Sequence, residues 1–438
     1  MDSFSHTVEG YLQPQATDSP LPFVTLGAVN KSGRHKLKRC APPLTGSFYY
    51  EKFFGTDCST VAAGPQDTNA VHWVASCSKL VTTIAALQCV EKGLLSLDGD
   101  IGDVLPEWKN PKILIGFDDD GEPILKPAQN HISLRYGRHA PLLFVASHAF
   151  RRHMLSRSSG MAYAFLDPLM SKYQNWHGAK PKNNLTIRLQ RDSFDEILIF
   201  EPGTRWRYSP EAEYVGLLIE RVNGGMKLGE YMRLNIFEPL GIKDMTFHLE
   251  AREDMRARLA RMWQRTPAGG LEQRPDWFMP DPVGDDFGGT GLYATAPELL
   301  KIYAALLRDG DDNGSKALLL KRETVDLMFT PHIPATAPDF ADARNASVFV
   351  RNSVFNSLPD DAAVNSGLGG VLNTSPVPGR RGAPSLTWSG MSNCFWWIDR
   401  ANGVAGLFLS QFMPGGDGKT IELLSKFEEA VYAATRTD

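Results

Sequence analysis

The segments with the strongest β pattern lie at the two ends of this chain, and the long stretch between them is mostly helical in pattern. Residues 23–29 are predicted to form a strand near the N-terminus, and the C-terminal runs 385–388, 394–399 and 404–412 are also β-rich. A sheet assembled from both ends must leave the middle of the chain as an insertion. We therefore predict an α/β (α+β) fold, with an antiparallel sheet from both chain ends, flanking helices and an inserted, mainly helical lobe.

The chain has 438 residues, which is long enough for two packed lobes. We assign residues 1–96 and 295–438 to the sheet lobe and residues 97–294, which include Tyr208, to the helical lobe. Thr295-Ala296-Pro297-Glu298 is a capping box with an early proline, so it predicts the start of a helix where the chain returns to the sheet lobe.

Composition excludes several classes of protein. The net charge is -4, with 22% charged residues, so a basic nucleic-acid-binding domain is not expected. No apolar run reaches the roughly 20 residues of a membrane-spanning helix, and the N-terminus lacks the pattern of a secretory signal. The five cysteines are scattered without any C-x-x-C pair. Reduced thiols in a cytoplasmic protein, with no metal site, are the expectation.

Ser76-Cys77-Ser78-Lys79 is an S-x-x-K motif at the start of the strongest predicted helix, residues 71–93. Positions i and i+3 share a helix face, so Lys79 can reach the Ser76 hydroxyl. A partly desolvated lysine can take the proton of that hydroxyl, and the helix N-terminus favours developing negative charge. Ser76 is the predicted nucleophile. The competing interpretation is a helix-capping serine followed by a solvated lysine.

Two further segments carry candidate residues. In Glu201–Ser209, a turn leads to Tyr208, whose phenol could shuttle a proton beside a cation such as Lys79. In Trp388-Ser389-Gly390, a strand edge could offer the N–H of Met391 as an oxyanion donor opposite that of Ser76. The alternatives are a half-buried tyrosine with a wet hydroxyl and an ordinary strand with a glycine bulge.

These three elements, in this order, resemble the serine β-lactamase, penicillin-binding-protein and esterase superfamily. The runs VASCSKLVTTIAALQ, SSGMAYAFLDPL, EPGTRWRYS, FEPLGIKDMTF and DDFGGTGLY further resemble fungal polyketide transesterases typified by the lovastatin side-chain acyltransferase. The similarity is collinear from about Phe23 to Tyr432. It implies a serine β-lactamase-like fold, Ser76 as the acylated residue, Lys79 and Tyr208 as the base and acid pair, and Tyr163 in the substrate pocket.

The sequence departs from the superfamily pattern at two places. Tyr208-Ser209-Pro210 lacks the asparagine of the usual Tyr-x-Asn, and Trp388 replaces the lysine of K-T-G. The second change removes a cation that helps antibiotic-handling members hold a substrate carboxylate. An indole suits an apolar acyl chain or polyketide better. Ser389 and Gly390 complete this predicted binding strand, and Trp73 is either part of the same pocket wall or a core aromatic.

Residues 136–152 interrupt the collinear similarity. Removing them would join Leu134-Arg135 directly to His153-Met154, as in relatives. Two hypotheses stay open: a retained intron in the gene sequence, or a genuine extra loop over the pocket mouth. Sequencing of the transcript distinguishes them.

The resemblance predicts a ping-pong acyltransferase that moves an acyl group from a thioester donor, through acylated Ser76, to a hydroxyl of a polyketide-type secondary metabolite. The donor is expected as a small thioester or on the acyl carrier protein of a polyketide synthase, and no cofactor is needed. An esterase or thioesterase with the same site is the main alternative. A catalytically silent binding protein is a second, and neither nucleic acid nor membrane is expected as a partner.

Overall fold

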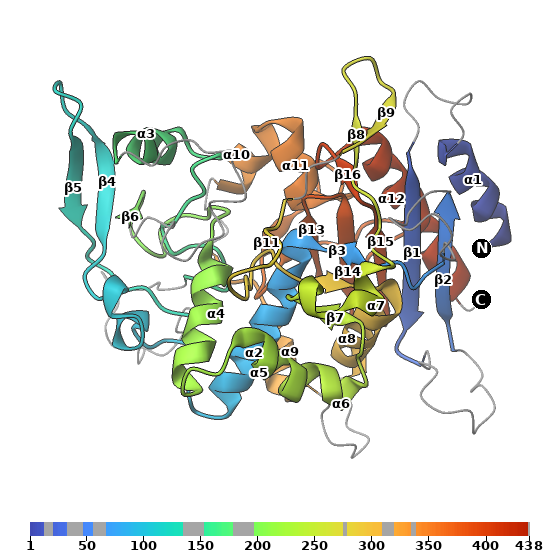
Figure 1. Ribbon diagram of the computed structural model, residues 1–438, viewed down its shortest axis with the longest axis horizontal. Helices are drawn as coiled ribbons and strands as arrows, with labels where there is room; N and C mark the ends of the chain where they lie inside the picture. The colour runs from blue at the N-terminus through green and yellow to red at the C-terminus, as the bar shows by residue number, and fades with distance from the viewer. Residues whose placement is uncertain are drawn as a thin grey trace.

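The computed structural model describes residues 1–12, 21–32, 47–55, 67–134, 153–177, 197–274, 278–308, 319–333 and 339–436. Its centre is a seven-stranded antiparallel sheet that combines strands from both ends of the chain (Figure 1). In spatial order the strands are β11 (Val364–Ser366), β12 (Val371–Asn373), β13 (Ser385–Gly390), β14 (Cys394–Asp399), β15 (Val404–Leu409), β1 (Phe23–Asn30) and β2 (Tyr49–Gly55). The sheet therefore combines both chain ends, as the sequence predicts, and it also contains β2, β11 and β12, which the sequence analysis did not predict.

The N-terminal strand β1 joins the sheet next to the last long strand, β15. Leu26 is paired with Phe408, and Val29 with Ala405. Helices cover both faces, which explains why the inner strands are buried along their whole length rather than on alternate residues. The terminal helices α1 (Asp2–Leu12) and α12 (Gly418–Thr435) pack on one face, whereas α2 (Ser78–Glu91) and α8 (Ala296–Arg308) pack on the other.

The segment between α2 and α8 is a mixture of helices and short strands. Helix α4 (Glu211–Val222) packs against α2. A hairpin of β4 (Lys112–Phe117) and β5 (Pro123–Pro127) projects on the side of the molecule that is far from both termini (Figure 1). The helices and turns here are η2 (Ile101–Asp103), η3 (Pro106–Trp108), α3 (Pro168–Trp176), α5 (Leu228–Met232), the π-turn η5 (Arg233–Phe237), α6 (Glu238–Leu240), η6 (Leu249–Ala251) and α7 (Glu253–Arg256).

Three small sheets supplement the main one, each with three strands. They are β3 (His72–Trp73), β10 (Tyr293–Ala294) and β7 (Met245–Thr246); β16 (Phe412–Met413), β8 (Trp263–Arg265) and β9 (Leu271–Gln273); and β5 (Pro123–Pro127), β4 (Lys112–Phe117) and β6 (Ile197–Leu198). Beyond α8 the chain forms α9 (Arg322–Met328), α10 (Asp339–Asn345) and α11 (Val348–Phe355). Division of the chain into lobes at residues 97 and 294 stays a prediction.

The helix that carries the S-x-x-K motif begins later than predicted. Instead of a continuous helix over residues 71–93, the chain forms strand β3, the 3₁₀ turn η1 (Ala75–Cys77) and then α2. Residues 72 and 73 pair with β10, and Ala75 has a φ of 46°, which a right-handed helix cannot contain. Helix α2 is buried from Ser78 to Cys89, so it is the central helix of the molecule.

The flanks of the 136–152 segment lie side by side. Leu155 N donates to Leu134 O over 3.2 Å, and Met154 N donates to Ser133 O over 3.1 Å. The segment itself lies outside the described residues, as do Cys40 and Cys58. The retained-intron and extra-loop hypotheses therefore both remain open.

The described part of the chain has neither a candidate membrane span nor a candidate metal cluster. None of its helices combines the length and apolar character needed to cross a membrane. Cys77, Cys89 and Cys394 are buried free thiols, and no cluster of three or more His, Cys, Asp or Glu side chains among these residues could hold a metal ion.

Candidate active site

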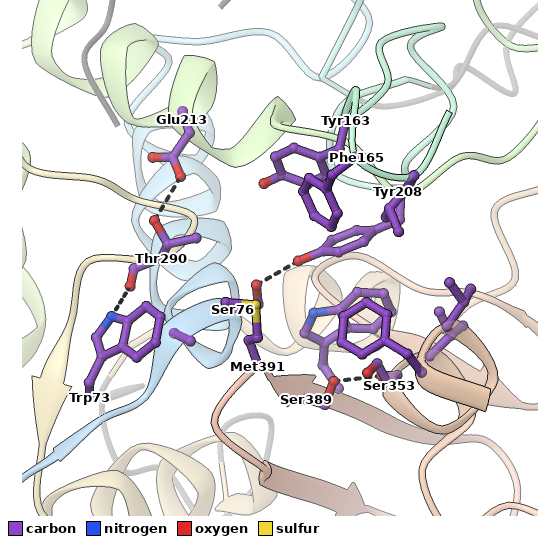
Figure 2. Close-up of a pocket in the computed structure, with 16 residues that line it drawn as sticks. Trp73, Ser76, Tyr163, Phe165, Tyr208, Glu213, Thr290, Ser353, Ser389 and Met391 are labelled. Carbon is purple, nitrogen blue, oxygen red and sulfur yellow. Dashed lines mark hydrogen bonds between the residues drawn. The ribbon is translucent and has the colours of Figure 1, made fainter. Parts of the chain in front are cut away.

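Ser76 lies in the turn that precedes α2, with its hydroxyl at the wall of a pocket (Figure 2). The preceding residue, Ala75, has left-handed backbone geometry, which costs free energy for any residue with a Cβ. The Ser78 hydroxyl holds this turn: its Oγ donates to Ala75 O over 2.6 Å and accepts from Leu292 N over 3.1 Å. The neighbouring contacts thus stabilise a strained turn that presents Ser76.

Lys79 lies one turn further along and contacts the same hydroxyl. Its Nζ is 3.1 Å from Ser76 Oγ and 2.7 Å from the carbonyl oxygen of Gly289. The side chain is buried, with 4% of its surface exposed. The alternative of a solvated lysine is therefore wrong.

Tyr208 also contacts the Ser76 hydroxyl. Its Oη and Ser76 Oγ are 2.5 Å apart, which is hydrogen-bond distance. The Tyr208 ring meets the rings of Tyr163 and Trp388 edge-on, with centroids 5.1 and 5.2 Å away. Lys79 Nζ lies 5.1 Å from the centre of the Tyr208 ring. The structure thus brings together the three residues that the sequence singles out, although they come from segments more than 130 positions apart.

Strand β13 ends with Trp388, Ser389 and Gly390. The side chains of Trp388 and Ser389 line the same pocket as Ser76. A Cβ on Gly390 would lie 2.3 Å from Val74 O, so only glycine lets β13 approach the Ser76 turn this closely. The glycine is therefore explained by close approach rather than by a bulge. Met391 follows directly and lines the pocket beside Ser76.

Trp73 is both a core aromatic and part of the pocket wall, the two alternatives that the sequence left open. It is fully buried and stacks on Phe278 with ring centroids 5.3 Å apart, yet it also lines the pocket. Its Nε1 donates to Thr290 O over 2.7 Å. Tyr163 lines the pocket as well. Burial and the neighbouring Tyr208 raise the pKa of the Tyr163 phenol, so it is neutral at physiological pH.

Glu213 is a pocket residue that sequence reasoning missed. It lies on α4, five positions after Tyr208, and accepts hydrogen bonds from Gly289 N over 3.1 Å and from Thr290 Oγ1 over 3.3 Å. Gly289 in turn accepts from Lys79 (2.7 Å), and Thr290 from Trp73. A Cβ on Gly289 would lie 2.4 Å from Glu213 Oε1. Glu213 therefore holds the turn that orients Lys79 and Trp73.

A second missed residue, Arg157, stacks on Trp388. Its Cζ is 3.7 Å from the Trp388 ring centre, and burial lowers the pKa of the guanidinium to about 10. Nearby, burial raises the pKa of Glu211 to about 8, although hydrogen bonds from Ser159 N and Oγ oppose the shift. No spacing rule connects Arg157 with Trp388, so the sequence offers no signal for this contact.

The pocket in front of Ser76 has mainly apolar walls and spans about 810 Å³, a volume that includes space open to solvent. Residues of α11 close the side opposite Trp73, and Ser389 Oγ donates to Ser353 O of this helix over 2.5 Å (Figure 2). Beyond the residues discussed above, the lining side chains that the sequence did not single out are Phe165, Leu166, Phe349, Val350, Ser353 and Val354. The arrangement suits an apolar substrate next to a serine nucleophile.

This chain is similar to known proteins over most of its length. Residues 45–426 match the Beta-lactamase family model. The chain is 36% identical to a lovastatin esterase from Penicillium rubens (90% of this chain, 93% of the relative) and 33% identical to a monacolin J acid methylbutanoyltransferase from Aspergillus terreus (89% of each). The unliganded structure of simvastatin synthase from Aspergillus terreus superposes with a TM-score of 0.80 at 28% identity, covering 99% of each chain. The predicted β-lactamase-like fold is confirmed.

Proposed function

The chain belongs to the beta-lactamase family, and from that membership and the geometry around Ser76 we propose that it transfers an acyl group from a thioester to a hydroxyl of a polyketide-type secondary metabolite. It is an enzyme of the serine acyltransferase and hydrolase class. The single observation that carries the proposal is the contact of one hydroxyl, Ser76 Oγ, with both Lys79 Nζ and Tyr208 Oη.

In the proposed first half-reaction, Ser76 Oγ attacks the thioester carbonyl carbon. The hydroxyl proton passes to the Lys79–Tyr208 pair, which lies at hydrogen-bond distance. The carbonyl oxygen becomes an oxyanion, and the N–H groups of Ser76 and Met391 are the proposed donors to it. Collapse of this intermediate breaks the C–S bond, the thiolate takes the proton from the pair, and an acyl-serine ester remains.

In the second half-reaction, a hydroxyl of the acceptor attacks the acyl-serine ester. The same Lys79–Tyr208 pair accepts the proton of this hydroxyl and returns it to Ser76 Oγ as the C–O bond to serine breaks. The product is an ester of the acceptor and the free enzyme. Trp73, Tyr163, Trp388, Ser389 and Gly390 are proposed to shape the binding pocket, and the donor is proposed to be a small thioester or an acyl group on a carrier protein of a polyketide synthase.

The second candidate function is hydrolysis by the same site. The lovastatin esterase of Penicillium rubens, at 36% identity, favours it. Both reactions share the acyl-enzyme and differ in whether water or an alcohol resolves it. For either function we keep the predictions of a cytoplasmic protein and of a reaction without a cofactor.

Intact-protein mass spectrometry tests the proposal. The enzyme is mixed with a short branched acyl thioester, with and without a panel of polyketide alcohols. We expect one added acyl group on Ser76 that persists in water and is discharged by an alcohol. A group lost equally fast in water alone would identify a hydrolase. Normal turnover by Ser76→Ala would refute both functions.

A further inference from the structure

Arg157 is a buried cation next to the proton path, and the proposed acyl transfer does not yet use it. The side chain is 4% exposed. Burial lowers the pKa of the guanidinium only to about 10, so it is charged at neutral pH. An arginine is almost never buried so completely unless other groups interact with it. The neighbours of Arg157 therefore indicate what its charge does.

The backbone of Arg157 is tied to the segment that carries Tyr208. Its φ is 60°, and a residue with a Cβ keeps such left-handed geometry only where the surrounding contacts require it. Arg157 O accepts a hydrogen bond from Arg207 N over 2.8 Å, and Ser158 O accepts one from Gly203 N over 2.8 Å. Arg157 is thus bonded to the residue directly before Tyr208.

The guanidinium of Arg157 is directed at the aromatic side chains beside the nucleophile. Its Cζ is 3.7 Å from the centre of the Trp388 ring, which the Tyr208 ring meets edge-on at 5.2 Å. Burial lowers the pKa of Arg157, and a negative charge on Tyr208 is the first of the causes that oppose this shift. The Arg157 cation and a negatively charged Tyr208 oxygen therefore attract each other.

Other titratable side chains surround Arg157, and they come from three segments. They are Lys79 of α2, Tyr163, Tyr208, and Glu211 and Glu213 of α4. Glu211 lines one small cavity with Arg157 and Lys79. Burial raises the pKa of Glu211 to about 8, so at neutral pH this carboxyl is mostly protonated and does not cancel the charge of Arg157. Glu213 lies beside Lys79 Nζ, at Gly289.

We propose that Arg157 is a positioning residue that stabilises the negative charge on Tyr208 Oη while this oxygen exchanges a proton with Ser76. The inference deepens the proposed function and rests on it. Figure 2 shows the Tyr208 oxygen directed at Ser76, 2.5 Å from Oγ. Arg157 transfers no proton itself. Its fixed charge, held against Trp388 in a buried site, lowers the energy of the state in which Tyr208 Oη is negative.

Single-turnover acylation by p-nitrophenyl butyrate at neutral pH tests the inference. Stopped-flow absorbance over a range of ester concentrations gives the acylation rate constant and the apparent dissociation constant of the ester separately. We expect Arg157→Gln to lower the rate constant about 10- to 10²-fold. The dissociation constant should change by less than about threefold, because the lost interaction acts only in the transition state.

Restoring the charge should restore the rate. Arg157→Lys keeps a cation at this position, and we expect it to acylate at least about fivefold faster than Arg157→Gln. A purely structural contact with Trp388 would not distinguish these variants by charge. Should Arg157→Gln fail to fold, Arg157→Met also lacks the charge and keeps an apolar side chain against Trp388, so it replaces Arg157→Gln in the comparison.

Arg344→Gln is the matched control. Arg344 also stacks on an aromatic ring, with Cζ 4.5 Å from the centre of the Phe355 ring. Its guanidinium donates to Pro359 O and Ala362 O, and the residue does not line the pocket. This variant should keep both wild-type constants.

Two results would overturn the inference. One is equal acylation rate constants in Arg157→Gln and Arg157→Lys. The other is a weaker apparent affinity for the ester in Arg157→Gln without a slower rate, which would mean that Arg157 only shapes the pocket wall through Trp388. Failure of the proposed function would look different, because Ser76→Ala would then release p-nitrophenol at the wild-type rate.

Discussion

Lys79 Nζ and Tyr208 Oη both contact the Ser76 hydroxyl, at 3.1 and 2.5 Å. A nucleophile held by two proton-handling groups can lose its proton to one and direct a proton to the leaving group from the other. The Tyr208 ring is fixed between Tyr163 and Trp388, so its hydroxyl has little freedom to move away. This explains how a site with no histidine among its described lining residues can perform acyl transfer.

At this scale we predict that Lys79→Ala and Tyr208→Phe each lower kcat by about 10²- to 10⁴-fold, the usual contribution of a positioned acid or base. Steady-state assays with an activated ester measure the loss, and circular dichroism checks that the fold is retained. If Tyr208→Phe keeps more than half of the wild-type kcat, the phenol is not part of the proton path.

The buried Glu211 carboxyl should make the stability of the folded protein depend on pH. Burial raises the pKa of this carboxyl from 4.5 to about 8 in the folded protein. A raised pKa means that the folded state binds the proton more tightly, so the stabilisation is complete below pH 4.5 and is lost as the pH rises through 8. Glu211→Gln stays neutral at all pH values. We therefore expect the Tm of this variant to fall less between pH 6 and pH 9 than the Tm of the wild type. Thermal unfolding across this range measures the difference, and equal losses would contradict the assignment.

At the scale of elements, the end of β13 and the turn before α2 are in direct backbone contact. Gly390 allows this contact because a Cβ there would lie 2.3 Å from Val74 O. The contact brings Met391, at the end of a strand, to the same pocket as Ser76, at the start of a helix. Separation of these two elements would separate the proposed oxyanion donors.

We therefore predict that Gly390→Ala reduces kcat by about 10²- to 10³-fold, as does loss of an oxyanion donor in other enzymes. Gly284→Ala is the control, because a Cβ at Gly284 meets no atom within 4 Å. The two variants should differ sharply in kcat, whereas their Tm values should lie within several degrees of each other. Equal kinetics would show that the β13 contact does not position the site.

On the scale of the whole molecule, the two chain ends together complete the main sheet and one of its covering layers. Strand β1 pairs with β15, and helix α1 packs beside α12. Helix α12 is also tied to the segment before β13 by a buried ion pair, in which Arg381 Nε donates to Glu428 Oε2 over 2.9 Å. Both side chains are at most 1% exposed.

Loss of one partner of this pair leaves a buried charge without compensation. We predict that Glu428→Ala lowers the free energy of unfolding by about 3–5 kcal/mol. Urea denaturation followed by tryptophan fluorescence measures it, and Glu422→Ala, at an exposed position of the same helix, should change stability by less than about 1 kcal/mol. A similarly small effect of Glu428→Ala would show that the ion pair does not stabilise the docking of α12.

The sequence alone determined the features that depend on short-range spacing and on the order of segments. The i, i+3 spacing of Ser76 and Lys79 requires only one helical turn, and the β-rich runs at both ends require a shared sheet. Even so, the predicted start of the helix was wrong, because pairing of residues 72 and 73 with β10 overrides the local pattern. The tertiary structure decided what surrounds the nucleophile. Glu213 and the wall from α11 meet the pocket, and Arg157 meets the pocket residue Trp388, through contacts between segments far apart in the chain. No local period encodes such contacts.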